Sequence, residues 1–203
     1  RLKQIHDAGT KIVILPDFDM DGISSGTLGF AGLAELGFNV SLFIPHTEDG
    51  YGFSAKTINS LIAEYPDVKT IITCDVGISC YAGISAAKLA GVDVLVTDHH
   101  KQSKKSEADV IVDPMRTDET YEFPYICGAC VLYKCLVRYS ELYCDRYMQE
   151  QIARLCVFAG IGTISDNMPL LYENRQLVRD SISIMRLLYS YDDFIVNNIT
   201  GCD

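Results

Sequence analysis

The sequence predicts an α/β protein with a doubly wound, mainly parallel five-stranded sheet flanked by helices and followed by a helical C-terminal part. In the first two-thirds of the chain, short apolar runs rich in β-branched residues alternate with segments of helical periodicity. The runs are apolar on both faces, as in a parallel sheet that is covered on both sides. From residue 128 onward the apolar residues recur at spacings of three and four, which is typical of helices.

The predicted elements alternate along the chain. Strands are expected at 11–15, 39–44, 70–74, 92–97 and 109–112, with helices at about 25–36, 55–65 and 82–90 between them. Gly37 and Gly91 follow the first and third of these helices, which is a common C-terminal signal. Further helices are expected at about 129–143, 146–161 and 173–190. We therefore divide the chain into an α/β core, 1–127, and a helical segment, 128–203, that completes the same domain.

Composition and cysteine usage narrow the class of protein. The chain has 203 residues, enough for a sizeable core, and its 48% apolar and 22% charged residues are ordinary for a globular protein. No apolar run reaches the ~20 residues needed to cross a bilayer, and the first residues lack a signal-peptide apolar region. Eight scattered cysteines indicate buried free thiols in a reducing compartment, so a cytoplasmic location is expected. A zinc or redox role for the single pair Cys127-x-x-Cys130 is the alternative.

The charge balance gives a second expectation. A formal net charge of −10 argues against a nucleic-acid binder, unless many of the acids are metal ligands whose bound cations reverse the local charge. The lysine-rich stretch 102–107 is predicted to be a solvated loop, with a basic substrate patch as the alternative. The chain neither begins with Met nor ends on an obvious closing element, so we expect more chain in the parent protein.

Acidic side chains follow three of the predicted strands. In a doubly wound sheet the carboxyl ends of the strands open into one crevice, so these clusters should meet there. His and Asp together supply the ligands that divalent transition metals accept. We also expect Gly22 to permit a sharp turn toward the next helix. The clusters are Asp17-Phe18-Asp19-Met20-Asp21-Gly22, Asp75-Val76-Gly77 and Asp98-His99-His100.

Two other interpretations of the acids compete with a metal site. Asp is common in loops after strands, and as a helix N-cap, without binding a metal. The spacing Asp-x-Asp-x-Asp-Gly also occurs in the EF-hand, but that loop needs a Glu six positions after the Gly, and Leu28 stands there. Three clusters at strand ends, one with tandem His, favour a functional centre.

As a set, these motifs resemble the first three motifs of the DHH phosphoesterase superfamily, and the triple Asp is similar to its RecJ branch. Segments 50–54, 108–114 and 162–170 also resemble RecJ segments, so the resemblance spans about residues 10–190 in order. One departure is Gly128-Ala129-Cys130-Val131-Leu132, where Cys130 replaces the second Gly of Gly-x-Gly-Val-Ala. The resemblance implies that 1–127 is the DHH metal-binding core, completed by 128–203. It also implies that the DHH-associated domain is absent from this chain.

The resemblance further implies a centre with two divalent metal ions, Mn²⁺ or Mg²⁺, with zinc left open by residue type. Asp75 would bridge the two ions. His100 would contact the phosphate, and Asp98 would orient a ligating His. The ligands of one ion would be Asp17, Asp19 and Asp75, and those of the other Asp21, Asp75, His99 and Asp166.

The implied activity is metal-dependent hydrolysis of a phosphodiester, with single-stranded DNA degraded from its 5′ end as in RecJ. Tyr51 is a candidate for stacking on a base, with a packed loop Tyr as the alternative. The alternative substrate is a small phosphodiester such as an oligoribonucleotide or cyclic dinucleotide. A non-catalytic RecJ-like binding module is the third possibility. No membrane partner is expected, and the sequence predicts no oligomeric state.

Overall fold

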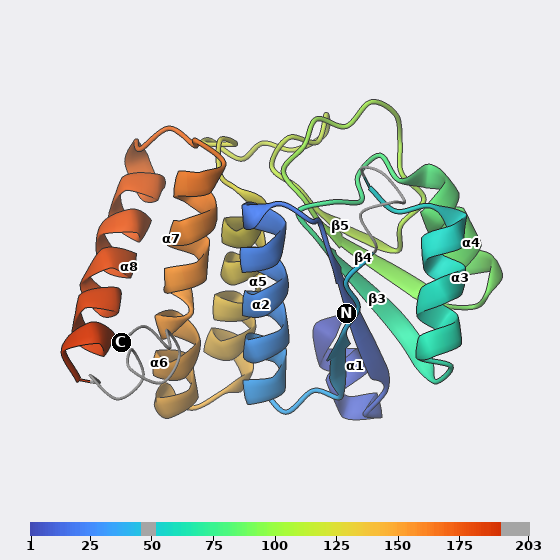
Figure 1. Cartoon of the computed structure of the whole chain (residues 1–203), viewed down its shortest axis with the longest axis horizontal. Helices are drawn as coiled ribbons and strands as arrows, with labels where there is room; N and C mark the ends of the chain where they lie inside the picture. Colours follow the sequence, from blue (N-terminus) through green and yellow to red (C-terminus); the bar gives the residue numbers. More distant parts are fainter. Residues whose placement is uncertain (46–51, 192–203) are drawn as a thin grey trace, which may run out of the picture.

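A single parallel sheet organises the computed structural model, which describes residues 1–45 and 52–191, with side chains to residue 187. Its strands are β1 (Lys11–Pro16), β2 (Val40–Leu42), β3 (Val68–Cys74), β4 (Asp93–Thr97) and β5 (Val110–Val112). They are ordered β2-β1-β3-β4-β5, and each neighbouring pair is parallel (Figure 1). The predicted fold class is confirmed.

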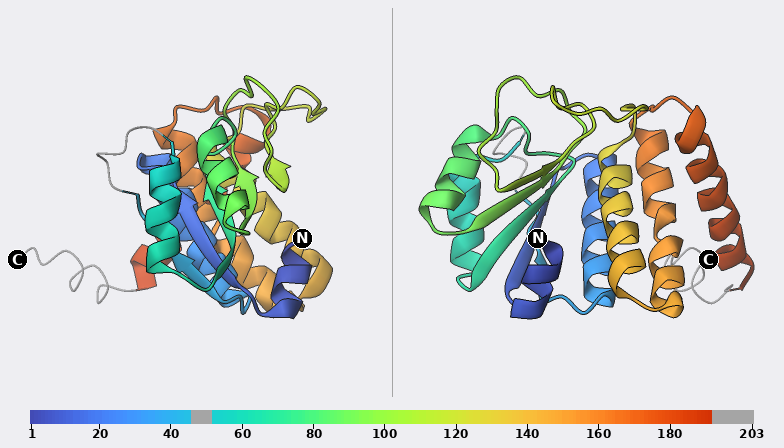
Figure 2. Two further views of the ribbon diagram at one scale, coloured as in Figure 1. Left: turned by 90° about the vertical axis from the view of Figure 1, so that its right-hand side faces the viewer. Right: turned by 180° about the vertical axis from the view of Figure 1, so that it is seen from behind.

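Helices cover both faces of this sheet. One face packs against α3 (Ala55–Glu64) and α4 (Tyr81–Leu89), and the other against α1 (Leu2–Ala8), α2 (Met20–Glu35) and α5 (Gly128–Tyr143). Beyond α2 and α5 lie α6 (Arg146–Arg154) and α7 (Cys156–Ser165), and α8 (Tyr172–Tyr191) packs on the far side of α7 (Figures 1 and 2).

The two cores follow the period of two along β1. In β1, Ile12 and Ile14 pack toward α2 and α5, whereas Val13 and Leu15 pack toward α3 and α4. The strand order 2-1-3-4-5 reverses direction between β1 and β3, and in open α/β sheets ligands bind at this switch point, outside the carboxyl ends of the strands. The topology therefore points to the segments that follow β1 and β3.

Three local features differ from the sequence prediction. The helix expected from about residue 25 begins at Met20, because Asp19 caps it: its Oδ1 accepts a hydrogen bond from Gly22 N at 2.8 Å. The prediction of a single helix at 146–161 was wrong. It is split at Leu155 because α6 is polar and buries only Ile152, whereas α7 is apolar and packs between α2 and α8. The short α1 was not predicted.

A close approach of α2 and α5 sets the position of the helical part. A Cβ at Gly32 would lie 2.5 Å from Leu136 Cδ1, so the absence of a side chain lets the two helices pack closely. Leu136 is fully buried in the core that α2, α5 and β1 share. No described helix is both long enough and apolar enough to cross a bilayer.

We expect Leu136→Ala to lower the free energy of unfolding by about 2–5 kcal/mol. The substitution leaves a cavity between α2 and α5, and the two helices already pack closely at Gly32, so they cannot move together to fill it. Leu142→Ala, on the same helix, is the control: Leu142 is 53% exposed, and its truncation should cost less than about 1 kcal/mol. Urea unfolding of both variants measures the difference. Equal losses of stability would contradict this account of the packing.

Candidate metal centre

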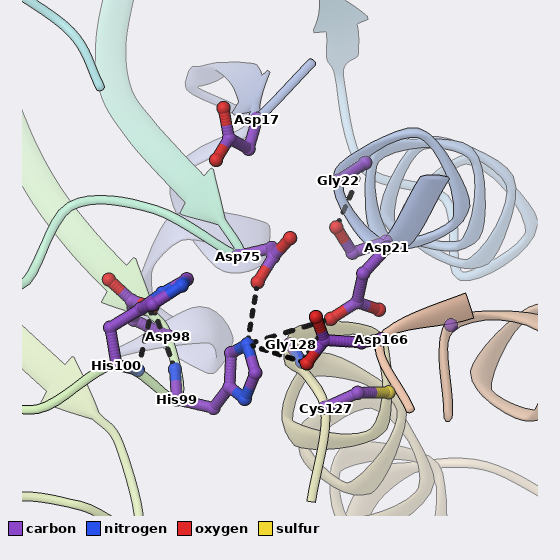
Figure 3. Close-up of polar contacts among 12 residues, drawn as sticks. Asp17, Asp21, Gly22, Asp75, Asp98, His99, His100, Cys127, Gly128 and Asp166 are labelled. Atoms are coloured by element: carbon purple, nitrogen blue, oxygen red, sulfur yellow. Dashed lines mark hydrogen bonds and ion pairs between the residues drawn. The ribbon is translucent and has the colours of Figure 1, made fainter. Parts of the chain in front are cut away.

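The structure brings the three acidic segments together at the carboxyl edge of the sheet, where Asp166, at the end of α7, joins them (Figure 3). In each of three groups, one potential ligand atom from every member lies within 4.8 Å of the others. Asp75 belongs to two of the groups, and so does His99. They are Asp17, Asp19 and Asp75; Asp21, His99 and Asp166; and Asp75, His99 and His100.

Asp75 belongs both to the group with Asp17 and Asp19 and to the group with His99 and His100. It directly follows β3, is only 1% exposed, and has a φ of 63°, in the left-handed region that non-glycine residues rarely adopt. Burial, and then the neighbouring Asp21 carboxylate, raise the pKa of Asp75 to about 10. None of the described groups makes a hydrogen bond to Asp75 Oδ1, although His99 Nε2 lies 3.0 Å away. This buried oxygen therefore lacks the partner that a carboxylate needs.

Asp21 is held by the N-terminus of α5. Its Oδ2 accepts a hydrogen bond from Gly128 N at 2.7 Å, and its Oδ1 accepts one from Ala129 N at 3.1 Å. A helix N-terminus favours a negative charge, so this contact stabilises a buried carboxylate. Glycines make room for it: a Cβ at Gly128 would lie 2.7 Å from Asp75 Oδ1, and one at Gly162 would lie 2.1 Å from Asp21 Oδ1.

His99 faces the acids from the end of β4. Its Nε2 lies 3.0 Å from Asp75 Oδ1, 3.6 Å from Asp166 Oδ2 and 3.8 Å from Asp21 Oδ2 (Figure 3). Burial raises the pKa of Asp166, and the Asp21 carboxylate adds to this rise while His99 opposes it. One ring nitrogen thus lies within 4 Å of three carboxylates that come from three different elements.

Asp98 positions His100. Its Oδ1 lies 2.7 Å from His100 Nδ1 and accepts a hydrogen bond from His99 N at 2.7 Å, while its Oδ2 accepts one from Ile78 N at 2.8 Å. Burial raises the pKa of Asp98, but the hydrogen bonds from His100 and Ile78 outweigh it and hold that pKa below its usual value. The same contact raises the pKa of His100. The contact of Asp98 with His99 is to its backbone, so the His ring that it orients is that of His100.

The first motif is only partly a loop. Asp17 follows β1 and is 5% exposed, and burial raises its pKa, opposed by the hydrogen bond from Phe18 N. Asp19 combines both interpretations of the sequence, since it caps α2 and belongs to a ligand group. The prediction that Gly22 makes a sharp turn was wrong. Gly22 is helical, and it is needed because a Cβ there would lie 2.4 Å from Asp17 O.

The structure also places the cysteines for which a zinc or redox role was the alternative. Cys127 is the N-cap of α5, and its buried Sγ accepts a hydrogen bond from Cys130 N at 3.4 Å. Burial raises the pKa of Cys127 and the pKa of Cys130, and neither thiol belongs to a metal-ligand group of the described residues. The seven cysteines within the described part of the chain are free thiols. Tyr51 lies outside the described residues.

Sequence reasoning missed the contact between α5 and Asp21, although Gly128 begins one of the segments compared with RecJ. It also missed Asp113, at the end of β5. This residue is 2% exposed, and burial raises its pKa to about 6. The Pro that follows it marks the end of a strand but gives no sign of burial.

The donor set fits divalent cations. Carboxylate oxygens and one or two imidazole nitrogens suit Mn²⁺ and related ions. The raised pKa values, and Asp75 Oδ1 without a hydrogen bond, indicate more buried carboxyl groups than the protein can ionise without a bound cation. Within the part of the chain that the structure describes, no Lys or Arg forms an ion pair with these ligand-group acids, so His99 and His100 are the basic side chains that face them.

Comparison with known proteins identifies the family of this chain. The DHH family, N-terminal domain, matches residues 11–161, and the chain belongs to this family. The single-stranded-DNA-specific exonuclease RecJ of Salmonella typhimurium is 32% identical over 188 residues, which are 88% of this chain and 32% of that protein. RecJ of Bacillus subtilis is 31% identical over 92% of this chain and 23% of its own length.

A solved structure of exonuclease RecJ bound to manganese superposes with a TM-score of 0.77 at 29% identity, covering 90% of this chain and 45% of that one. The chain spans about a third or less of the length of these two curated relatives.

Metal affinity should depend on pH. With a pKa of about 10, Asp75 carries a proton in the ion-free protein at neutral pH, and a cation must displace it. We expect the affinity for Mn²⁺ to rise between pH 6 and pH 8, by up to about tenfold per pH unit for each proton released. Titration calorimetry in two buffers of different ionisation enthalpy counts the protons. An affinity independent of pH would contradict this assignment.

The pKa of His100 should depend on Asp98. In Asp98→Asn the pKa of His100 should fall toward 6.5, because the hydrogen bond that raises it is removed. NMR titration of the ion-free protein measures this pKa, with His100→Gln to assign the resonance.

The free energy of unfolding should depend on pH through the same pair, Asp98 and His100. The contribution of His100 is fully present below pH 6.5 and is lost as the pH rises through its raised pKa. That of Asp98 is present above pH 3.8 and is lost as the pH falls through its lowered pKa. Asp98→Asn should therefore destabilise the protein most between about pH 4 and 6.5. A stability difference that does not vary with pH would contradict the pairing.

Proposed function

We propose that this chain is the catalytic domain of a phosphodiester hydrolase that uses two divalent cations, Mn²⁺ or Mg²⁺, and degrades single-stranded DNA from its 5′ end. One observation carries the proposal. The ligand group on the β1 side contains Asp75, and so does a group on the His99 side, so two ions can bind with one carboxylate between them. The residues proposed as ligands are Asp17, Asp19, Asp21, Asp75, His99 and Asp166.

The protein's own residues fix the geometry of this centre. Asp21 is oriented by the N-terminus of α5, so its carboxylate is set before any ligand binds, and Asp75 stands buried directly after β3. Such fixed polar groups need little rearrangement during reaction. The side chain of His100 is 44% exposed and keeps its Nδ1 on Asp98, so a protonated Nε2 is the group that can donate to a phosphate oxygen.

A bound pair of divalent ions supplies Lewis-acid polarisation of the phosphoryl group and favours deprotonation of an attacking water at neutral pH. No side chain is then needed as a dedicated general base. This agrees with a centre in which every proposed ligand except His99 is a carboxylate.

The choice of substrate rests on the relatives. They are named as single-stranded-DNA-specific exonucleases and match most of this chain, and the RecJ structure with manganese matches the fold. No described feature favours a small phosphodiester or a purely binding role, so these remain outcomes of the test.

The test is hydrolysis of 5′-phosphorylated single-stranded DNA with Mn²⁺. We expect Asp75→Asn to lower the rate by about 10³-fold or more, equivalent to about 4 kcal/mol, because the shared ligand is removed. Asp67→Asn, an exposed acid at the start of β3, is the matched control and should retain full activity. Chelation with EDTA should abolish activity, and added Mn²⁺ should restore it.

The outcomes separate the alternatives. Cleavage confined to dinucleotides or cyclic dinucleotides would indicate the small-substrate class. Mn²⁺ binding without hydrolysis of any of these substrates would indicate a binding module. An active Asp75→Asn variant would overturn the proposed centre.

A further inference from the structure

The loop between β4 and β5 carries three lysines next to the metal centre. Lys101 directly follows His100, and Lys104 and Lys105 come three and four residues later. The loop stands above the carboxyl edge of the sheet, on the side of α4 (Figure 1). Consecutive Cα atoms are about 3.8 Å apart, so Lys101 begins within about 8 Å of the proposed ligand His99.

Tyr81, at the start of α4, anchors this loop. Its hydroxyl accepts a hydrogen bond from Lys104 N at 3.1 Å and lies 2.9 Å from Lys104 O, to which it can donate. The ammonium of Lys104 lies 4.1 Å from the centre of the Tyr81 ring, a cation–π contact. Ser106 is buried on the other side of the lysines. Tyr81 thus holds the loop backbone at Lys104, while the lysine side chains are exposed.

The positive charge of the loop has no direct acidic partner. All three lysines are exposed, and no carboxylate within the described residues forms an ion pair with any of them. Two nearby acids are already paired, Asp109 with Lys88 at 3.6 Å and Asp118 with Arg116 at 2.7 Å. The chain as a whole has a net charge of −10, but this loop places three lysines within five residues, next to the metal centre and without an ion pair.

We propose that this loop, the lysine loop of residues 101–105, binds the phosphate backbone of the nucleic-acid strand as it leaves the metal centre. The proposal rests on the proposed function, and it adds the path of the strand: past His100 and over the end of β4 toward α4. Lys101 and Lys105 make the phosphate contacts, and Lys104 holds the loop on Tyr81. Point charges of this kind bind phosphates without regard to base sequence.

The test compares a strand that reaches the loop with one that does not. The double variant Lys101→Gln, Lys105→Gln should raise the KM for a twelve-nucleotide strand about five- to tenfold, with kcat unchanged, and leave the KM for a dinucleotide unaltered. The dependence of log KM on log salt should become shallower by about 0.7 for each phosphate that a lysine no longer binds. Lys104 is kept so that the loop stays anchored.

The control is Lys11→Gln, Lys69→Gln, which removes the same charge at the opposite edge of the sheet, where β1 and β3 begin. It should change neither KM nor the salt dependence. If the lysine-loop variant equals the wild type on the long strand while hydrolysis proceeds, the loop proposal fails and the proposed function stands. An equal rise in KM for both substrates would place the lysines at the centre itself and would also overturn the path.

If the chain cleaves neither substrate, the proposed function fails. Fluorescence anisotropy of the same labelled twelve-mer in Mn²⁺, now undisturbed by cleavage, still tests the loop. Weaker binding by the double variant than by the control supports it, and equal binding overturns it.

Discussion

Buried negative charge at the carboxyl edge of the sheet is the constraint on which the rest of this structure depends. Asp21, Asp75 and Asp98 are each at most 2% exposed, and a buried carboxylate is costly unless it is hydrogen-bonded or paired. Asp98 has backbone and imidazole donors, and Asp21 has the N-terminus of α5. Of these three, Asp75 keeps a buried oxygen without a hydrogen bond, and it is the residue that groups on both sides of the centre share. A divalent cation bound between the carboxylates would balance this charge.

This constraint explains why the helical part is packed where it is. The hydrogen bond from Gly128 to Asp21 joins residues 107 positions apart, and it requires α5 to begin directly over the acids. Glycines at 128 and 162 allow that approach, since side chains there would overlap with Asp75 and Asp21. Asp166 then enters from α7. The division at residue 127 remains a prediction, but the centre takes residues from both sides of it.

The sequence predicted what depends on local pattern. Apolar runs located every strand of the described sheet, and polar residues after three of them located the edge where ligands would bind. It failed where the outcome depends on tertiary contact. The break at Leu155 lies between a polar helix that buries only Ile152 and an apolar helix packed between α2 and α8, and the need for Gly22 follows from its distance to Asp17 rather than from a turn. The hydrogen bonds from the N-terminus of α5 to Asp21 have no local signal, either at Asp21 or at Gly128.

The net charge of a chain is a weak guide to its ligands, for a physical reason. A formal charge of −10 sums over the whole chain, whereas a ligand experiences charges only within about a Debye length, ~8 Å at physiological ionic strength. The acids of the centre belong with the cations they would bind, and Asp109 and Asp118 are paired with basic side chains. A phosphate backbone that passed beside His100 would therefore meet the lysines of the loop. An acidic protein can present a basic path to a polyanion when its acids are neutralised where the strand passes.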